Sequence, residues 1–299
     1  MSNQSERLQS AMEYLMTYGW AILIIAVVLG ALFQLGIFNA STFTPKAPPG
    51  ACHVFRPNGP MTSSFINLQG ICNGELPQYA AKFNGASSEI SILSGLPTGN
   101  PQYTVSIWFS TPFIPSTPYL GLALVSWGTD GVLDEINAFR LTAISECANG
   151  GFYNYWWAND LKACLSSKLS TNTWHFAVAS FNGNTRSIYM DGSLITSDSP
   201  TGHNIVGSSG YIGVTAPTLF PDYFNGELAN VQIYNTSLSA NELNALYSEG
   251  IGGAPIKLNN LVGWWPLNGD AKDYSGNNNN GVPTGISFTS SWAQGYSAP

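Results

Sequence analysis

An uncharged and strongly apolar run near the N-terminus constrains this chain more than any other feature. The run extends from Gly19 to Phe38, and Gln34 is its only strongly polar side chain. A helix of this length spans roughly 30 Å, the thickness of the hydrocarbon core of a bilayer. Helices of globular cores are rarely apolar on all sides for so long. We therefore expect a long hydrophobic α-helix over residues 9–38 that is long enough to lie in a membrane.

The residues that flank this run differ from those of an ordinary secretory signal. Such a signal has a shorter apolar segment that ends at a small-residue cleavage site. Here the run is longer, and residues 39–50 (NASTFTPKAPPG) have the composition of a Pro-rich linker. The helix is therefore expected to stay on the mature protein.

The segment RLQSAMEYLMTYGWAILII, which starts at Arg7, resembles the class III signal peptide of archaeal type IV pilin-like proteins. In that family a prepilin-type peptidase cuts before a Gln that is followed four positions later by Glu. The resemblance implies a leader peptide over residues 1–8, cleavage between Leu8 and Gln9, and a contact of Glu13 with a neighbouring subunit that sets the filament register. Leu8 departs from the family, which usually has Gly before the cut. An interfacial Glu13 that faces lipid headgroups is the alternative.

After the linker the sequence changes to short runs rich in Val, Ile, Phe, Tyr and Trp, which are separated by Gly, Pro and Asn. This pattern, with 13% aromatic and only 9% charged residues, is typical of many short strands joined by turns. We expect strands at Tyr103–Phe109, Leu120–Trp127, Ala138–Ile144, Trp174–Phe181, Ser187–Met190 and Glu227–Tyr234. Hairpin turns are expected at Asn182–Asn184 and Asp191–Gly192, and a helix with a capping box at Ser239–Ser248.

The order of WHFAV, YMDGSL, GYIG and FNGELANVQIY is similar to laminin G-like, concanavalin A-like domains, over about Ala81 to Gly250. The resemblance implies a mainly β fold for residues 51–299, a two-sheet antiparallel jelly-roll sandwich. Leu261–Gly281 looks like the motif that normally opens such a domain. Segment 258–299 is therefore expected to be a permuted strand segment that pairs with its own sandwich or, alternatively, with a neighbouring subunit.

The four cysteines form two pairs that are close in sequence and have no metal-binding spacing. Disulfides Cys52–Cys72 and Cys147–Cys164 are favoured for an extracellular domain, and the other connectivities stay open. Asn39 and Asn235 each begin an N-glycosylation sequon. The net charge is −7 and no Lys/Arg cluster occurs, which excludes nucleic acid as a partner.

Catalytic motifs are missing from the chain. None of the nine glutamates is followed two residues later by Asp, as the Glu-x-Asp-x-x-Glu pattern of glucanases in this fold requires. His53, His175 and His203 are isolated, and His175 lies inside an apolar strand. We therefore expect a protein that is not an enzyme.

Two kinds of ligand site are candidates. The resemblance implies calcium in loops, at Asp270, Asp273 and Asn277 or at Asp130 and Asp134, although such turn residues are common without metal. The aromatic run Phe152–Trp157 includes the candidate sugar-binding residues Tyr153, Tyr155, Trp156 and Trp157. An aromatic strand in a sandwich core has the same sequence pattern.

These features favour a structural and adhesive role. The chain is interpreted as a homopolymeric subunit of an extracellular pilus-like filament, held in the cytoplasmic membrane before assembly, whose lectin-like domain binds surface glycans. A membrane-anchored monomeric lectin that keeps its leader is the alternative. A secreted carbohydrate-active enzyme is the weakest hypothesis, because the expected acidic pattern is missing.

Overall fold

The computed structural model describes residues 18, 20–29, 52–55, 67–70, 77–118, 122–215, 221–297 and 299, with only the backbone for residues 52–55, 67–70 and 294. The chain divides into two compact units, Met1–Pro48 and Pro49–Pro299. This division falls close to the boundary predicted between the linker and the β domain.

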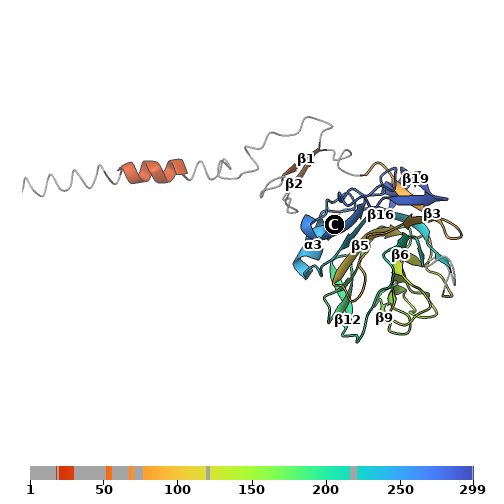
Figure 1. Ribbon diagram of the computed structural model, residues 1–299. Helices are drawn as coiled ribbons and strands as arrows, with labels where there is room; N and C mark the ends of the chain where they lie inside the picture. Colours follow the sequence, from red (N-terminus) through yellow and green to blue (C-terminus); the bar gives the residue numbers. More distant parts are fainter. Residues whose placement is uncertain are drawn as a thin grey trace, which may run out of the picture. The chain divides into compact units, whose positions relative to one another are not determined.

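In the N-terminal unit, Tyr18 and residues 20–29 are helical (Figure 1), and the burial pattern shows that their side chains are exposed. These residues lie within the helix predicted over residues 9–38, the rest of which is outside the described residues. Among the described residues, no helix has both the length and the apolar character that crossing a bilayer requires. The predicted leader, Leu8, Gln9, Glu13 and the Asn39 sequon lie outside the described residues.

The second unit is a sandwich of two antiparallel sheets (Figure 1). The first sheet contains, in spatial order, β12 (Ser193–Asp198), β11 (Arg186–Met190), β10 (His175–Phe181), β5 (Tyr103–Ser110), β16 (Asn225–Tyr234), β3 (Ala80–Asn84) and β19 (Ser287–Thr289), with β17 (Leu261–Trp265) also paired to β16. The second sheet contains β18 (Gly281–Thr284), β4 (Glu89–Ile92), β13 (Gly210–Ile212), β6 (Ala123–Gly128), β7 (Ile136–Leu141), β8 (Gly151–Tyr155) and β9 (Leu161–Cys164).

The remaining elements are short. They are the strand pairs β1 (Cys52–Phe55) with β2 (Asn67–Gly70) and β14 (Val214–Thr215) with β15 (Asp222–Tyr223), the helix α3 (Ala240–Ser248), and the 3₁₀ turns η1 (Leu258–Asn260) and η2 (Ser291–Gly295). The mainly β, two-sheet antiparallel sandwich predicted from the sequence is confirmed.

Strand β5 shows why the central strands are buried on both faces. Val105, Ile107 and Phe109 point into the core between the sheets, as their alternation predicted. Trp108 points to the opposite face, where it packs in a second apolar cluster with Leu243 and Leu246 of α3. The helix therefore covers the outer face of the first sheet (Figure 1).

The predicted helix is confirmed, including its capping box. The Ser239 hydroxyl accepts from the Glu242 backbone N–H, and the Glu242 carboxylate accepts from the Ser239 N–H at 2.8 Å. The predicted strand at Ala138–Ile144 is shifted: β7 runs from Ile136 to Leu141. It ends earlier because the Ile144 N–H donates to the Pro115 carbonyl in a loop instead of to a strand partner.

The C-terminal segment pairs with its own chain, the first of the two alternatives above. Strand β17 lies antiparallel to β16, and Trp265 is fully buried in the core. The chain then passes through β18 in the second sheet and, after a turn at Gly285 (φ +63°), enters β19 in the first. This crossing connects the two sheets at one edge of the sandwich.

A polar network lies inside the core at β5, β7 and β8. Asn137 Oδ1 is 2.8 Å from the Tyr103 hydroxyl, 2.8 Å from Asn154 Nδ2 and 2.9 Å from Trp156 Nε1. The guanidinium of Arg186 stacks on the Trp156 ring at 4.0 Å and is held by Asp198 at 2.7 Å. Burial raises the pKa of the Tyr103 hydroxyl far above its usual value, so this group is neutral at physiological pH.

Candidate functional site

The aromatic run that the sequence singled out is divided between two environments. Along β8 and the two residues that follow it, the rings alternate between two environments. Phe152 and Trp156 are fully buried in the core, whereas Tyr153, Tyr155 and Trp157 are half-buried on the other side of the sheet. Trp156 is therefore a core residue. Of the four candidate sugar-binding residues, only Tyr153, Tyr155 and Trp157 could contact a ligand at the surface.

The half-buried rings already have partners within the protein. The Arg140 guanidinium lies 5.2 Å from the centre of the Tyr153 ring and 5.5 Å from that of Tyr155, and the Lys162 amine lies 5.4 Å from that of Tyr153. Tyr155 and Trp157 make an edge-to-face pair at 6.0 Å. Cation–π and ring contacts therefore occupy much of the ring surface that a sugar would need.

The loop proposed for calcium at Asp270, Asp273 and Asn277 is held by hydrogen bonds to its own backbone. The Asp273 carboxylate accepts from the N–H groups of Trp264, Ser275 and Asn279 and from the Ser275 hydroxyl, at 2.8–3.0 Å. A carboxylate has about four acceptor positions, and these four donors fill them. Asn277 turns its Nδ2 donor, not its oxygen, toward the Leu261 and Val262 carbonyls. This loop does not fit a calcium site.

At the second calcium candidate, the carboxylates of Asp130 and Asp134 accept hydrogen bonds from different protein groups. Asp130 Oδ1 accepts from the Gly131 N–H at 2.9 Å, and Asp134 Oδ1 accepts from Asn159 Nδ2 at 3.0 Å. Burial raises the pKa of Asp130 above its usual value. In the described part of the chain, no three His, Cys, Asp or Glu side chains gather as metal ligands. Calcium at Asp130 and Asp134 stays a prediction.

One of the two favoured disulfides is present: Cys147 and Cys164 are bonded, with Cα atoms 5.2 Å apart. It joins the end of β9 to the loop before β8. Cys52 lies in β1, and Cys72 lies outside the described residues, so the Cys52–Cys72 bond stays a prediction. Asn235 is exposed directly after β16, where its sequon is accessible.

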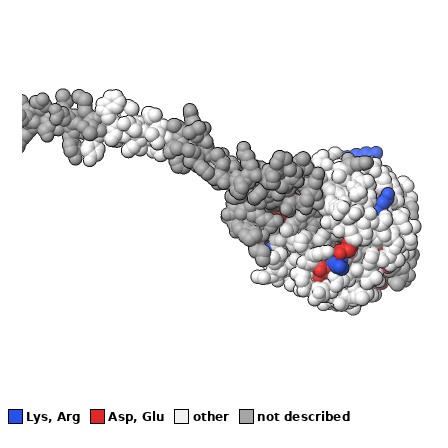
Figure 2. All heavy atoms as spheres, turned by 90° about the horizontal axis from the view of Figure 1, so that it is seen from above, with Lys and Arg blue, Asp and Glu red and all other residues white. Residues whose placement is uncertain are grey.

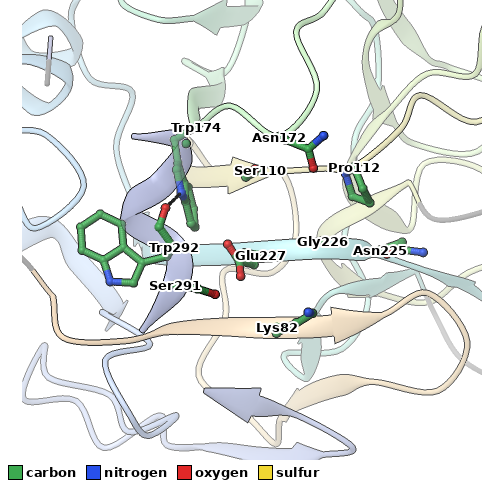
Figure 3. A pocket seen from close by; sticks show the side chains of 11 residues that line it. Lys82, Ser110, Pro112, Asn172, Trp174, Asn225, Gly226, Glu227, Ser291 and Trp292 are labelled. Carbon is green, nitrogen blue, oxygen red and sulfur yellow. Dashed lines mark hydrogen bonds between the residues drawn. The ribbon is translucent and has the colours of Figure 1, made fainter. Parts of the chain in front are cut away.

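A pocket that the sequence did not indicate lies on the first sheet, at β3, β5 and the start of β16 (Figure 3). Its volume is about 250 Å³. Its lining residues are Lys82, Ser110, Pro112, Asn172, Trp174, Asn225, Gly226, Glu227, Ser291, Trp292 and Gly295.

The C-terminal segment builds one wall of this pocket. Trp174 Nε1 donates to the Trp292 carbonyl at 2.8 Å, and the Trp174 N–H donates to the Gly295 carbonyl at 3.0 Å. Both indole rings are largely buried, so they shape the wall more than they face solvent. At the floor, Gly226 (φ +144°) lies so close to the Ser110 carbonyl that a Cβ there would collide with it.

Four polar side chains of the pocket lack partners. Within the described part of the chain, Lys82, Asn172, Asn225 and Glu227 make no side-chain hydrogen bond or ion pair. Glu227 and Asn225 are half-buried, and Lys82 and Asn172 are exposed. The lack of partners is unusual for half-buried Asn225 and Glu227, because polar groups of native proteins are usually paired when they are withdrawn from water. These four groups are therefore available to a ligand.

Electrostatics distinguish Glu227 from an ordinary surface carboxylate. Burial raises the pKa of the Glu227 carboxyl, and the positive charge of Lys82 opposes this shift. Lys82 lies directly opposite Glu227 in the register of β3 and β16, yet the two do not approach to ion-pair distance. Charged side chains are few on the face that Figure 2 shows.

Sequence reasoning missed this pocket because its residues come from five separate segments of the chain. Lys82, Ser110, Asn172, Asn225 and Ser291 belong to different strands or loops, and none stands in a recognisable motif. The alternation in β16 could have indicated that Asn225 and Glu227 share one face, but not that the C-terminus closes over it.

Comparisons with known proteins agree with this architecture. Residues 84–244 match the model of the concanavalin A-like lectin/glucanases superfamily. No curated protein sequence matches the chain. A candidate carbohydrate-binding protein from Bacteroides ovatus superposes with a TM-score of 0.54 at 16% identity, over 74% of this chain and 61% of that one. This chain thus spans less than two thirds of that protein.

A heptameric SAP-like pentraxin from Limulus polyphemus has a TM-score of 0.53 at 15% identity, over 71% of this chain and 94% of that one. At such identities the two structures establish the fold alone. The family match covers more than half of the sequence, from β3 to the first part of α3. The chain belongs to the concanavalin A-like lectin/glucanases superfamily.

Proposed function

We propose that this protein is a lectin-like adhesion protein of the cell surface that binds carbohydrate in the pocket of the first sheet. The observation that carries the proposal is the convergence of four unpartnered side chains, Lys82, Asn172, Asn225 and Glu227, on that pocket. Superfamily membership and the solved similar structure of a candidate carbohydrate-binding protein support the same class of ligand.

The chemistry of the pocket suits a sugar. Amide and carboxylate groups make paired hydrogen bonds to neighbouring hydroxyls, and small pockets with a few well-placed polar groups fix the orientation of a ligand. The described lining residues include one carboxylate, that of Glu227, whereas glycoside hydrolysis generally uses two. Together with the missing Glu-x-Asp-x-x-Glu pattern, this favours binding without catalysis.

A glycan array with the full chain tests the binding role. We expect wild-type protein to bind a subset of glycans and the double variant Asn225→Ala, Glu227→Ala to lose that binding. The matched control is Tyr153→Ala, which changes the aromatic face of β8 and should keep the wild-type pattern. If the double variant kept the wild-type glycan pattern, or if Tyr153→Ala lost it, the binding site would lie outside the pocket.

For the N-terminal segment we propose the filament role. The basis is the sequence context of Gln9 and Glu13, which resembles pilin-like proteins, and the disulfide Cys147–Cys164, which suits an extracellular domain. In this proposal the chain is held in the membrane, cut by a prepilin-type peptidase, and assembled with copies of itself into a surface filament. Leu8 in place of Gly favours the second candidate, an uncut membrane-anchored lectin.

Mass spectrometry of the native N-terminus separates these two candidates. A mature chain that starts at Gln9 supports assembly, and an intact start at Met1 or Ser2 supports the anchor. In the assembly case, Glu13→Gln should abolish filaments while membrane insertion stays intact. Filaments of that variant at normal density would contradict the registration role of Glu13.

A further inference from the structure

The charged groups of the pocket are a single pair with opposite signs. Lys82 on β3 and Glu227 on β16 face each other in the antiparallel register, and both line the pocket (Figure 3). The other lining residues are uncharged. Discrimination between charged and neutral ligands therefore depends on these two side chains.

The two groups have complementary hydrogen-bonding requirements. An ionised Glu227 carboxylate only accepts, and the Lys82 ammonium only donates. Because they do not pair with each other, both are free to bind a partner that enters the pocket. A hydroxyl group can donate to one and accept from the other, and neighbouring hydroxyls of a sugar can do both at once.

Charged sugars satisfy only half of this pair. The carboxylate of an acidic sugar would accept from Lys82 but would meet the like charge of Glu227. The ammonium group of an amino sugar would pair with Glu227 but would meet Lys82. In a half-buried site such repulsion is less screened than on an open surface.

Resting on the function proposed above, we propose that the Lys82–Glu227 pair makes this pocket selective for uncharged polyhydroxylated ligands, such as neutral hexoses, over acidic sugars and amino sugars. Each of the two residues rejects one class: Glu227 excludes the acidic sugars and Lys82 excludes the amino sugars. Removal of one charge should therefore admit one class and leave the other excluded.

The test titrates the full chain with three sugars of one series, D-galactose, D-galacturonate and D-galactosamine, and repeats this with the gluco and manno series. Saturation-transfer NMR gives the dissociation constants. We expect the neutral member of a series to bind about tenfold more tightly than either charged member, which corresponds to roughly one charge-assisted hydrogen bond. This wild-type ranking tests the proposal without any variant.

Two variants then assign the selectivity. Glu227→Gln should strengthen binding of the acidic sugar about tenfold and leave the amino sugar weak, and Lys82→Met should do the reverse. The controls are Glu89→Gln and Lys272→Met. Glu89 is a half-buried glutamate on β4, and Lys272 is an exposed lysine in the loop between β17 and β18; neither residue lines the pocket. Both controls should keep the wild-type ranking.

The possible failures are distinguishable. Tighter binding of a charged sugar by wild-type protein, or an unchanged ranking in both pocket variants while sugars still bind, would overturn the selectivity and leave carbohydrate binding in place. If no sugar of any class binds and the indole N–H resonance of Trp174 does not shift, carbohydrate binding at the pocket itself fails.

Discussion

The aromatic strand β8 and the pocket between β3 and β16 differ in how their side chains are partnered. Along β8 the rings of Tyr153 and Tyr155 contact Arg140, and Trp156 is closed inside the core. In the pocket the polar groups of Asn225 and Glu227 have no partner. The first region looks like a binding site in the sequence, and the second has the free groups that binding requires.

The comparison teaches that residue type alone does not identify a ligand surface in a β-sandwich. Rings contribute to binding when their faces are accessible, and polar groups do so when their hydrogen-bonding capacity is not already used. We therefore expect substitutions in the β8 region to change stability and substitutions in the pocket to change the ligand binding proposed above.

Removal of the Trp156 side chain should have the largest effect. Trp156→Ala deletes a fully buried indole, its bond to Asn137 and its stacking with Arg186, so we expect the free energy of unfolding to fall by about 3–5 kcal/mol. Guanidinium denaturation measures this loss. Trp157→Ala, at the neighbouring half-buried ring, should cost less than half as much; equal losses would contradict the division of this aromatic run.

The disulfide beside β8 should also act on stability alone. Cys147 and Cys164 are 17 residues apart, and in the chain-entropy model opening such a loop costs about 3 kcal/mol. The variant Cys147→Ser, Cys164→Ser should unfold at a lower denaturant concentration and keep the sugar affinity of wild-type protein. A parallel loss of affinity would show that the pocket depends on this loop.

Acidification should destabilise the β8 region through His203. Its ring stacks on Trp156 at 3.5 Å, and burial lowers its pKa to about 3. Below the unfolded pKa of about 6.5 the unfolded chain binds a proton that the folded chain excludes. Stability is therefore fully present above about pH 6.5 and falls by about 1.4 kcal/mol per unit as pH decreases toward 3.

Unfolding measured between about pH 6.5 and pH 4.5 checks this dependence. Because other groups titrate in the same range, the quantity to compare is the slope of wild-type protein against that of His203→Phe, which keeps an aromatic ring. The variant should have the shallower slope. Identical slopes would mean that protonation of His203 does not contribute.

The smallest effect belongs to the pocket and concerns affinity. Asn225→Ala removes one unpartnered amide, so the dissociation constant for a bound neutral sugar should rise about fivefold, as expected for one net hydrogen bond. Its free energy of unfolding should change by less than about 0.5 kcal/mol. Isothermal titration and denaturation measure the two quantities, and Tyr153→Ala should leave the sugar affinity unchanged. If Tyr153→Ala weakened sugar binding and Asn225→Ala did not, the β8 region would be the binding site instead of the pocket.

Much of the fold was predictable because local patterns agree with the tertiary structure. Strand β5 was found from the alternation of Val105, Ile107 and Phe109, and α3 from the Ser239 capping box. These signals are strong because each depends on neighbouring residues alone. The short strands β18 and β19 had no such signal: β18 is Gly-Val-Pro-Thr, and its pairing with β4 is set by the closure of the sandwich.

The candidate site was the less predictable part. The sequence shows that Phe152–Trp157 is aromatic, but the side on which each ring lies depends on the register of β7 and β8. Likewise, Asp273 has the residue type of a calcium ligand, and only the folded loop reveals that backbone N–H groups surround it. The pocket required contacts across more than two hundred residues, from Lys82 to Trp292.

The pairing of β19 with β3 has a consequence for the timing of folding. Thr289 lies opposite Ala80, so β3 is covered only by a strand that is synthesised about two hundred residues later. At roughly 5–20 residues per second, the ribosome needs on the order of 10–40 s to cover that interval. During this time the backbone groups along one edge of β3 are unpaired, and unpaired strand edges are prone to aggregation. The pocket, whose wall contains Trp292, is therefore complete only after the central strands of both sheets have been synthesised.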